Sequence, residues 1–144
     1  MKPDAYVELI DNADVYDVAS KSPLELAGNL SARMNNQIRM KREDLQPVFS
    51  FKLRGAYNKL ASLPDSAIAA GVICSSAGNH AQGVALAARR LGARAVIVMP
   101  VTTPTIKVDA VAALGGEVVP HGDNYDEAYA KARELAAAEK LEFV

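Results

Sequence analysis

The sequence predicts an α/β protein in which a parallel sheet has helices on both faces. Two observations predict this fold class. From residue 68 onward, short apolar strands alternate with helices that end at glycines. These strands also lack the polar alternation of a half-exposed sheet, which is typical of strands buried on both faces. A chain of 144 residues is long enough for one domain with a sizeable core.

Composition excludes several classes of function. Half of the residues are hydrophobic and 23% are charged, as in globular proteins, and the net charge of −1 gives no reason to expect nucleic acid or an anionic membrane as a partner. No segment resembles a signal peptide or a membrane span. One cysteine excludes an internal disulfide, and two distant histidines do not suggest a metal site. We therefore expect a cytoplasmic protein without a bound metal.

The first 67 residues have a less regular pattern than the rest. Pro23 precedes an amphipathic stretch, and later apolar residues recur at Leu53, Tyr57 and Leu60 with helical spacing. In chain order, the predicted elements are a helix over 24–34, a strand over 37–44, a loop over 45–50 and a helix over 51–63.

The remaining residues alternate regularly. Gly92 ends one predicted helix, Pro104 lies near the first turn of the next, and Gly115 follows its end. The predicted strands are 70–76, 93–100, 117–122 and 141–144, and the helices between them are 81–92, 103–116 and 124–140. Since the last strand opens with the final residues, we expect the chain to be a fragment of a longer protein.

The loop SSAGNH, residues 75–80, joins the first regular strand to its helix. Ligands of parallel α/β sheets bind beyond the carboxyl ends of strands, and the free N–H groups of a helix N-terminus attract anions. The loop is thus either a cradle for a carboxylate or phosphate or a plain turn with a serine cap. Gly78 in the loop and Gly83 in the helix that follows match neither the dinucleotide fingerprint nor the phosphate-binding P-loop.

Lys52 is the second candidate. Ser50 can cap the helix that follows, which places Lys52 in the first helical turn behind an aromatic residue, with Arg54 close by. A helix N-terminus, a neighbouring cation and aromatic cover all disfavour the ammonium form, so we expect a lowered pKa, as a Schiff-base lysine requires. The alternative is an exposed lysine without a special role.

Other polar residues have simpler interpretations. Arg54 is either a surface charge or the partner of Glu43 or Asp44. His80 fits a hydrogen-bond donor at a helix start better than a general base, because no triad partner is nearby. Cys74 fits an inert core thiol.

Two motifs in order, SFKLRGAYNKL and then SSAGNHAQGVA, resemble the serine/threonine dehydratase family of fold-type II pyridoxal-phosphate enzymes, the fold of the tryptophan synthase β-subunit. KREDLQPVFSFKLRGAYNKL and VIVMPVTTPTIKVDAV are most similar to its biosynthetic threonine dehydratase branch. The resemblance runs from about Val15 to Val144. It implies pyridoxal 5′-phosphate as cofactor, an amino-acid substrate and a homo-oligomer.

The resemblance also implies roles for individual residues. Lys52 would hold the cofactor as a Schiff base, Phe51 would pack beside its ring, and Asn79 would bond its 3-hydroxyl group. The loop that receives the substrate carboxylate would consist of Ser76, Ala77, Gly78, Asn79 and His80.

The implied reaction is the deaminating dehydration of L-threonine to 2-oxobutanoate and ammonia, in isoleucine biosynthesis. Serine racemases of this family carry a serine where this chain has Ala77, so the resemblance favours elimination over racemisation. Residues 1–52 would belong to a large catalytic domain and residues 53–144 to a small domain. The family's phosphate-binding loop would lie beyond residue 144, so we expect little turnover by this chain alone. A serine dehydratase and a non-catalytic anion-binding module remain the alternatives.

Overall fold

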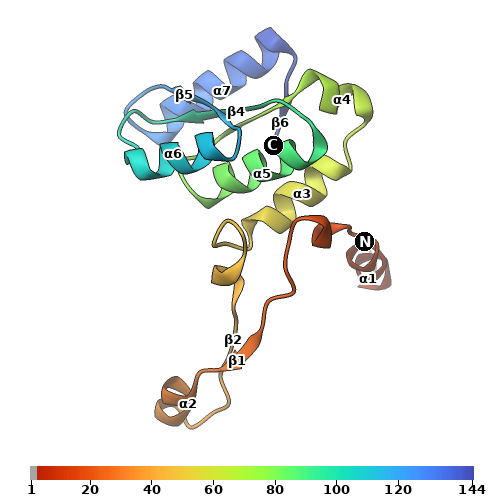
Figure 1. Ribbon diagram of the computed structural model, residues 1–144, viewed down its shortest axis with the longest axis vertical. Helices are drawn as coiled ribbons and strands as arrows, with labels where there is room; N and C mark the ends of the chain where they lie inside the picture. Colours follow the sequence, from red (N-terminus) through yellow and green to blue (C-terminus); the bar gives the residue numbers. More distant parts are fainter. Residues whose placement is uncertain (1–2) are drawn as a thin grey trace.

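A four-stranded parallel sheet organises the C-terminal half of the structure, a computed structural model that describes residues 3–144 (Figure 1). Its strand order is β5-β4-β3-β6, and each neighbouring pair is parallel. The strands are β3 (Val72–Ser75), β4 (Ala95–Met99), β5 (Glu117–Pro120) and β6 (Glu142–Phe143). The predicted parallel sheet is confirmed, including its last strand.

Helices cover both faces of this sheet, as the sequence predicts (Figure 1). Because side chains alternate along a strand, Val72 and Cys74 of β3 face one helix layer while Ile73 faces the other. The first layer contains α5 (Asn79–Leu91) and α6 (Thr105–Ala113), and the second contains α7 (Tyr125–Glu139). Every residue of β3 and β4 is buried, which explains their continuous apolar sequences.

Helix α3 (Lys52–Ala61) packs against α5. Leu53, Tyr57 and Leu60 are buried, as their helical spacing predicts. The hydroxyl group of Tyr57 donates a hydrogen bond of 2.7 Å to Asp17, so the same face of α3 also holds the N-terminal region. A short helix, α4 (Asp65–Ala70), then leads through Gly71 into β3.

An arm, residues 20–50, extends away from the α/β unit, residues 52–144 (Figure 1). The predicted helix over 24–34 is wrong in its first four residues, because Leu24–Leu26 forms β1 and pairs antiparallel with β2 (Arg39–Lys41), and Ala27 lies between β1 and the helix that follows. Helix α2 (Gly28–Met34) fills the rest of that prediction. The reason is the Leu-Glu-Leu alternation, which suits a strand once a partner strand is present.

Two further elements had no sequence prediction, namely α1 (Pro3–Asp11) and the 3₁₀ turn η1 (Val15–Asp17). The strand predicted over 37–44 forms only over Arg39–Lys41, and a second 3₁₀ turn, η2 (Glu43–Leu45), replaces its end. Helix α4 was not predicted either, because six residues are too few to show a helical pattern in the sequence. Within residues 3–144, no helix is both long and apolar enough to cross a membrane.

The central strand offers a test of the core. Ile97 of β4 is fully buried, whereas Ile106 of α6 is 77% exposed. We expect Ile97→Ala to lower the free energy of unfolding by about 2–5 kcal/mol, because it removes buried methyl groups and leaves a cavity. Ile106→Ala is the matched control, with a change within about 0.5 kcal/mol. Urea unfolding followed by circular dichroism measures both, and equal losses would contradict the assigned core.

Candidate functional site

Lys52 lies at the first position of α3, as predicted. The Ser50 hydroxyl accepts a hydrogen bond of 3.2 Å from the Lys52 N–H, as the sequence predicts, although the N-cap residue of α3 is Phe51, which makes no side-chain cap. The Lys52 side chain is exposed, and its Nζ lies 5.3 Å from the centre of the Phe51 ring. None of the ion pairs among residues 3–144 includes Lys52. Its amine is therefore free to react with a ligand.

The loop SSAGNH lies between β3 and α5, at the carboxyl end of a central strand. The Ser76 hydroxyl accepts a hydrogen bond of 3.3 Å from the Gly78 N–H and so shapes the turn. The first α5 bond runs from the Gln82 N–H to the Gly78 carbonyl, and no side chain caps the N–H groups before it. Those groups, of Asn79, His80 and Ala81, face outward from the helix start as donors for an anion.

A buried hydroxyl at the base of this loop lacks a partner. The Oγ atom of Ser75, the last residue of β3, accepts and donates no hydrogen bond among residues 3–144, although the residue is only 7% exposed. Burying a hydroxyl without a hydrogen bond costs free energy. The Thr103 hydroxyl is buried without a partner as well, so the Ser75 hydroxyl does not by itself mark a ligand site, but a polar ligand at the loop would satisfy it.

The structure brings Lys52 and the loop to the same end of the α/β unit. Gly83, one turn into α5, lies directly against the backbone of Lys52 and Leu53. At the other end of α3, Lys59 forms an ion pair of 3.1 Å with Glu142, which pairs with the amino end of β3 at Val72. Helices α3 and α5 therefore run in the same direction, and both begin at the carboxyl edge of β3.

A polar clamp holds the segment that precedes Lys52. Arg54 forms an ion pair of 2.8 Å with Glu43, so the carboxylate partner left open by the sequence is Glu43, while Asp44 pairs with Arg42. Gln46 is 1% exposed, and its amide bonds both the N–H and the carbonyl group of Ser20 at 2.8 Å. These bonds connect the arm to the first turn of α3. We call Ser20, Glu43, Gln46 and Arg54 the clamp.

The clamp changes the acidity of its charged members. The Arg54 guanidinium, helped by hydrogen bonds from Ser22 and Gln46, lowers the pKa of Glu43 to about 2 against the opposing effect of desolvation. The same pair raises the pKa of Arg54. Glu43 is thus a carboxylate at any physiological pH.

The loop between the clamp and Lys52 contains a strained residue. Phe49 has a φ of 54°, in the left-handed region that bulky side chains rarely adopt. Its neighbours Val48 and Ser50 are buried and hold the backbone in place. Strain of this kind persists only where surrounding contacts enforce it, and it is common at ligand sites.

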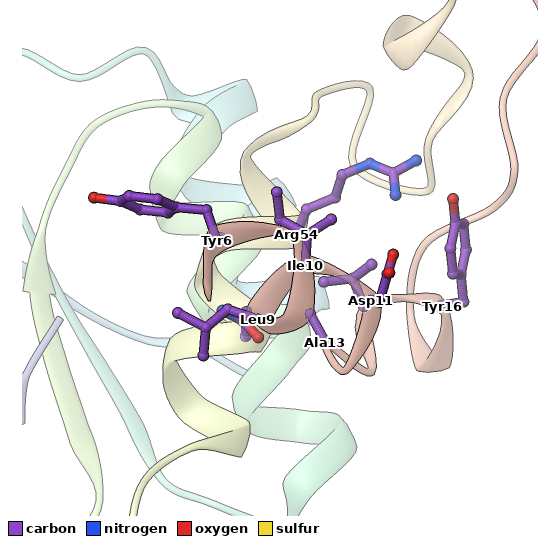
Figure 2. Close-up of a pocket in the computed structure, with 10 residues that line it drawn as sticks. Tyr6, Leu9, Ile10, Asp11, Ala13, Tyr16 and Arg54 are labelled. Carbon is purple, nitrogen blue, oxygen red and sulfur yellow. The ribbon is translucent and has the colours of Figure 1, made fainter. Parts of the chain in front are cut away.

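A cavity of ≈ 610 Å³ lies elsewhere, between α1, η1 and the opposite face of α3 (Figure 2). Tyr6, Leu9 and Ile10 of α1 form one wall, and Arg54 lies at its rim. Neither Lys52 nor any residue of the loop lines it. We place the candidate site at the loop and not in this cavity, because Lys52 and the uncapped N–H groups of α5 both lie outside its lining.

The other polar candidates are His80 and Cys74. The His80 Nε2 lies 3.3 Å from the Val144 carbonyl oxygen, to which it can only donate, as its interpretation as a helix-start donor predicts. Burial raises the pKa of the Cys74 thiol to about 12, which makes the thiol inert. No pattern in the sequence points to Gln46, whose role depends on Ser20, 26 residues away.

Comparisons with known proteins agree with this geometry. The family model described as "Pyridoxal-phosphate dependent enzyme" matches residues 15–144. The biosynthetic L-threonine dehydratase of Burkholderia multivorans is 58% identical over 142 residues, which are 96% of this chain and 28% of that protein. The chloroplastic biosynthetic threonine dehydratase of Arabidopsis thaliana is 60% identical over 96% of this chain and 24% of its own length. The chain thus spans about a quarter of these curated relatives.

Solved structures show the same fold. Processed threonine deaminase isoform 2 of Solanum lycopersicum superposes with a TM-score of 0.94 at 53% identity, covering 100% of this chain and 43% of that one. Maize serine racemase superposes with a TM-score of 0.89 at 28% identity, covering 98% and 42%.

The clamp predicts an acid-dependent stability. A carboxylate with a lowered folded-state pKa stabilises the fold above its unfolded value near 4.5, and this contribution is lost as the pH falls toward about 2. We expect Glu43→Gln to lower the free energy of unfolding at pH 7 by about 1.5–3 kcal/mol, the range for hydrogen bonds to charged groups. The difference from the unsubstituted protein should shrink between pH 4.5 and 2.

Glu134 provides the control for this experiment. Its carboxylate pairs with Lys131, but its side chain is 67% exposed. Glu134→Gln should therefore leave stability nearly unchanged across the same pH range, since exposed pairs contribute little. Chemical unfolding at a series of pH values measures the free energy of unfolding of both variants. If this free energy changes with pH in Glu43→Gln as it does in the unsubstituted protein, the clamp is not the source of the acid-dependent stability.

Proposed function

Because the chain belongs to the family of pyridoxal-phosphate dependent enzymes, we propose that it forms part of a lyase that converts L-threonine to 2-oxobutanoate and ammonia. The observation that carries this proposal is the position of Lys52 beside the uncapped start of α5. The names of the relatives, biosynthetic threonine dehydratases, support threonine as the substrate. This reaction would serve isoleucine biosynthesis.

The residues present fit the cofactor. Lys52 supplies an exposed amine without an ionic partner, and Phe51 supplies an aromatic ring next to it. Asn79 is exposed at the first position of α5, where its amide can bond the ring hydroxyl of the cofactor. When bound, pyridoxal phosphate supplies an electron sink for negative charge at the substrate Cα.

Lys52 has two roles in this proposal. Its amine would hold the cofactor covalently, and the same amine would serve as the base that accepts the Cα proton of the substrate. A lysine without an ionic partner among residues 3–144 suits both roles, because no carboxylate holds its amine. The clamp and the Ser50 cap fix the backbone from which the side chain extends.

The loop receives the substrate carboxylate. Ser76, Ala77, Gly78 and His80 are half-buried, so they can enclose a small anion without losing access to solvent. The N–H groups at the start of α5 donate to the carboxylate and hold the Cα–H bond in one orientation relative to Lys52. Ala77 offers no proton donor on the opposite face of the substrate, which favours elimination over racemisation.

The arm and the α/β unit correspond to two domains in this proposal. Residues 1–52 would form part of a large catalytic domain and residues 53–144 a small domain. The exposed apolar side chains of the arm would be covered by the rest of that large domain: Leu24, Leu26, Leu30, Met34 and Met40. We propose a homo-oligomer in the cytoplasm, acting on a free amino acid.

Covalent trapping tests the proposed cofactor. The full natural chain that carries this sequence is incubated with pyridoxal phosphate, reduced with borohydride and mapped by mass spectrometry. We expect the phosphopyridoxyl group on Lys52, and we expect Lys52→Ala to lower kcat by at least about 10²–10⁴-fold, because it removes the base. Lys59→Ala, in the last turn of the same helix, is the control. If the phosphopyridoxyl group were found at other residues and Lys52 were unmodified, the lyase proposal would be excluded and the anion-binding module would remain.

Substrate preference tests the choice of threonine over serine. The two amino acids differ by one methyl group, and such a group in a fitted pocket changes kcat/KM by about 10–200-fold. We expect kcat/KM to be at least tenfold higher for threonine, measured by 2-oxo acid formation. A preference for serine would assign the protein as a serine dehydratase.

A further inference from the structure

We propose that Gly83 is a positioning residue, which sets the distance between Lys52 and the substrate loop by keeping α3 in backbone contact with α5. This inference rests on the proposed function, since it takes Lys52 and Asn79 as parts of one site. Gly83 itself touches neither cofactor nor substrate in the proposal.

The contact at Gly83 is made by backbone on both sides. A Cβ atom at this position would lie 3.2 Å from the Lys52 carbonyl carbon, the Leu53 nitrogen and the Leu53 Cα. These distances are shorter than the roughly 3.5–4.0 Å at which carbon atoms pack. The obstructing atoms belong to the main chain, so no side-chain rotation can relieve the overlap. A methyl group would have to push the first turn of α3 away from α5.

The contact also lies at a sensitive place. Gly83 follows Asn79 by one helical turn, about 6 Å along α5, and touches the peptide unit that joins Lys52 to Leu53. Leu53 is 1% exposed, and the clamp holds Arg54 immediately after it. Any displacement of α3 at this point is therefore transmitted to Lys52, while the loop remains attached to β3.

Gly55 shows that this constraint is specific to Gly83. Gly55 lies in the first half of α3, three residues after Lys52, yet a Cβ atom at Gly55 would meet nothing within 4 Å among residues 3–144. Helix propensity favours alanine over glycine by about 1 kcal/mol at both positions. The steric difference between Gly83 and Gly55 thus separates the effect of position from the effect of propensity.

The test uses Gly83→Ala in the full natural chain. The first readout is independent of turnover: the rate at which the cofactor-free protein forms a borohydride-reducible adduct with pyridoxal phosphate at Lys52. The second readout is the split between kcat and KM for threonine. We expect Gly83→Ala to slow the adduct and lower kcat by about tenfold, with KM within about threefold, because sub-ångström misplacement of a reacting group is costly.

Two control variants distinguish positioning from packing. Gly55→Ala should leave the adduct rate unchanged. Ala87→Val overpacks the same face of α5 one turn further from Lys52, so it should lower Tm without slowing the adduct. An adduct rate for Gly83→Ala that equals the rate of the unsubstituted protein would overturn the inference, and so would a failure of Gly83→Ala to fold. Absence of a Lys52 adduct in the unsubstituted protein would instead overturn the proposed function.

Discussion

The direct contact between α3 and α5 is the constraint on which the rest of the structure depends. Helix α3 is the only element, among residues 3–144, that packs on α5 with one face and holds the arm through Arg54 with another. Its first residue is Lys52, and α5 begins with the loop residue Asn79. The two motifs that are separate in the sequence become one site because these helices start at the same edge of the sheet.

The sequence predicted the α/β unit well because its signals are local. Fully apolar strands such as Ala95–Met99 and the glycine stop at Gly92 depend only on neighbouring residues. The arm was harder to predict for the opposite reason. Strand β1 has three residues and forms only because β2 pairs with it, and the Gln46–Ser20 bonds join residues 26 positions apart. No pattern within a short window carries such information.

The candidate site was predictable in its residue types but not in its assembly. Ser50, Lys52 and the loop could be identified from capping and helix-start chemistry, and Arg54 could be given a carboxylate partner without saying which. The backbone contact of Gly83, the strained Phe49 and the orphan hydroxyl of Ser75 depend on tertiary structure. Of these features, the Gly83 contact holds α3 against α5, and none of the three has a signal within a short stretch of sequence.

The clamp and the Gly83 contact together limit how this protein can be recombined with its relatives. Residues 43–54 fix the backbone of Lys52 from one side, and residues 79–83 fix it from the other. A chimera with a crossover between these segments would take the segment that contains Lys52 from one parent and the start of α5 from another. The two segments would then lack the contacts that each makes in its own parent. Gene shuffling within the family should therefore yield active proteins mainly when both segments come from the same parent, even though residues 55–78 separate them in the chain.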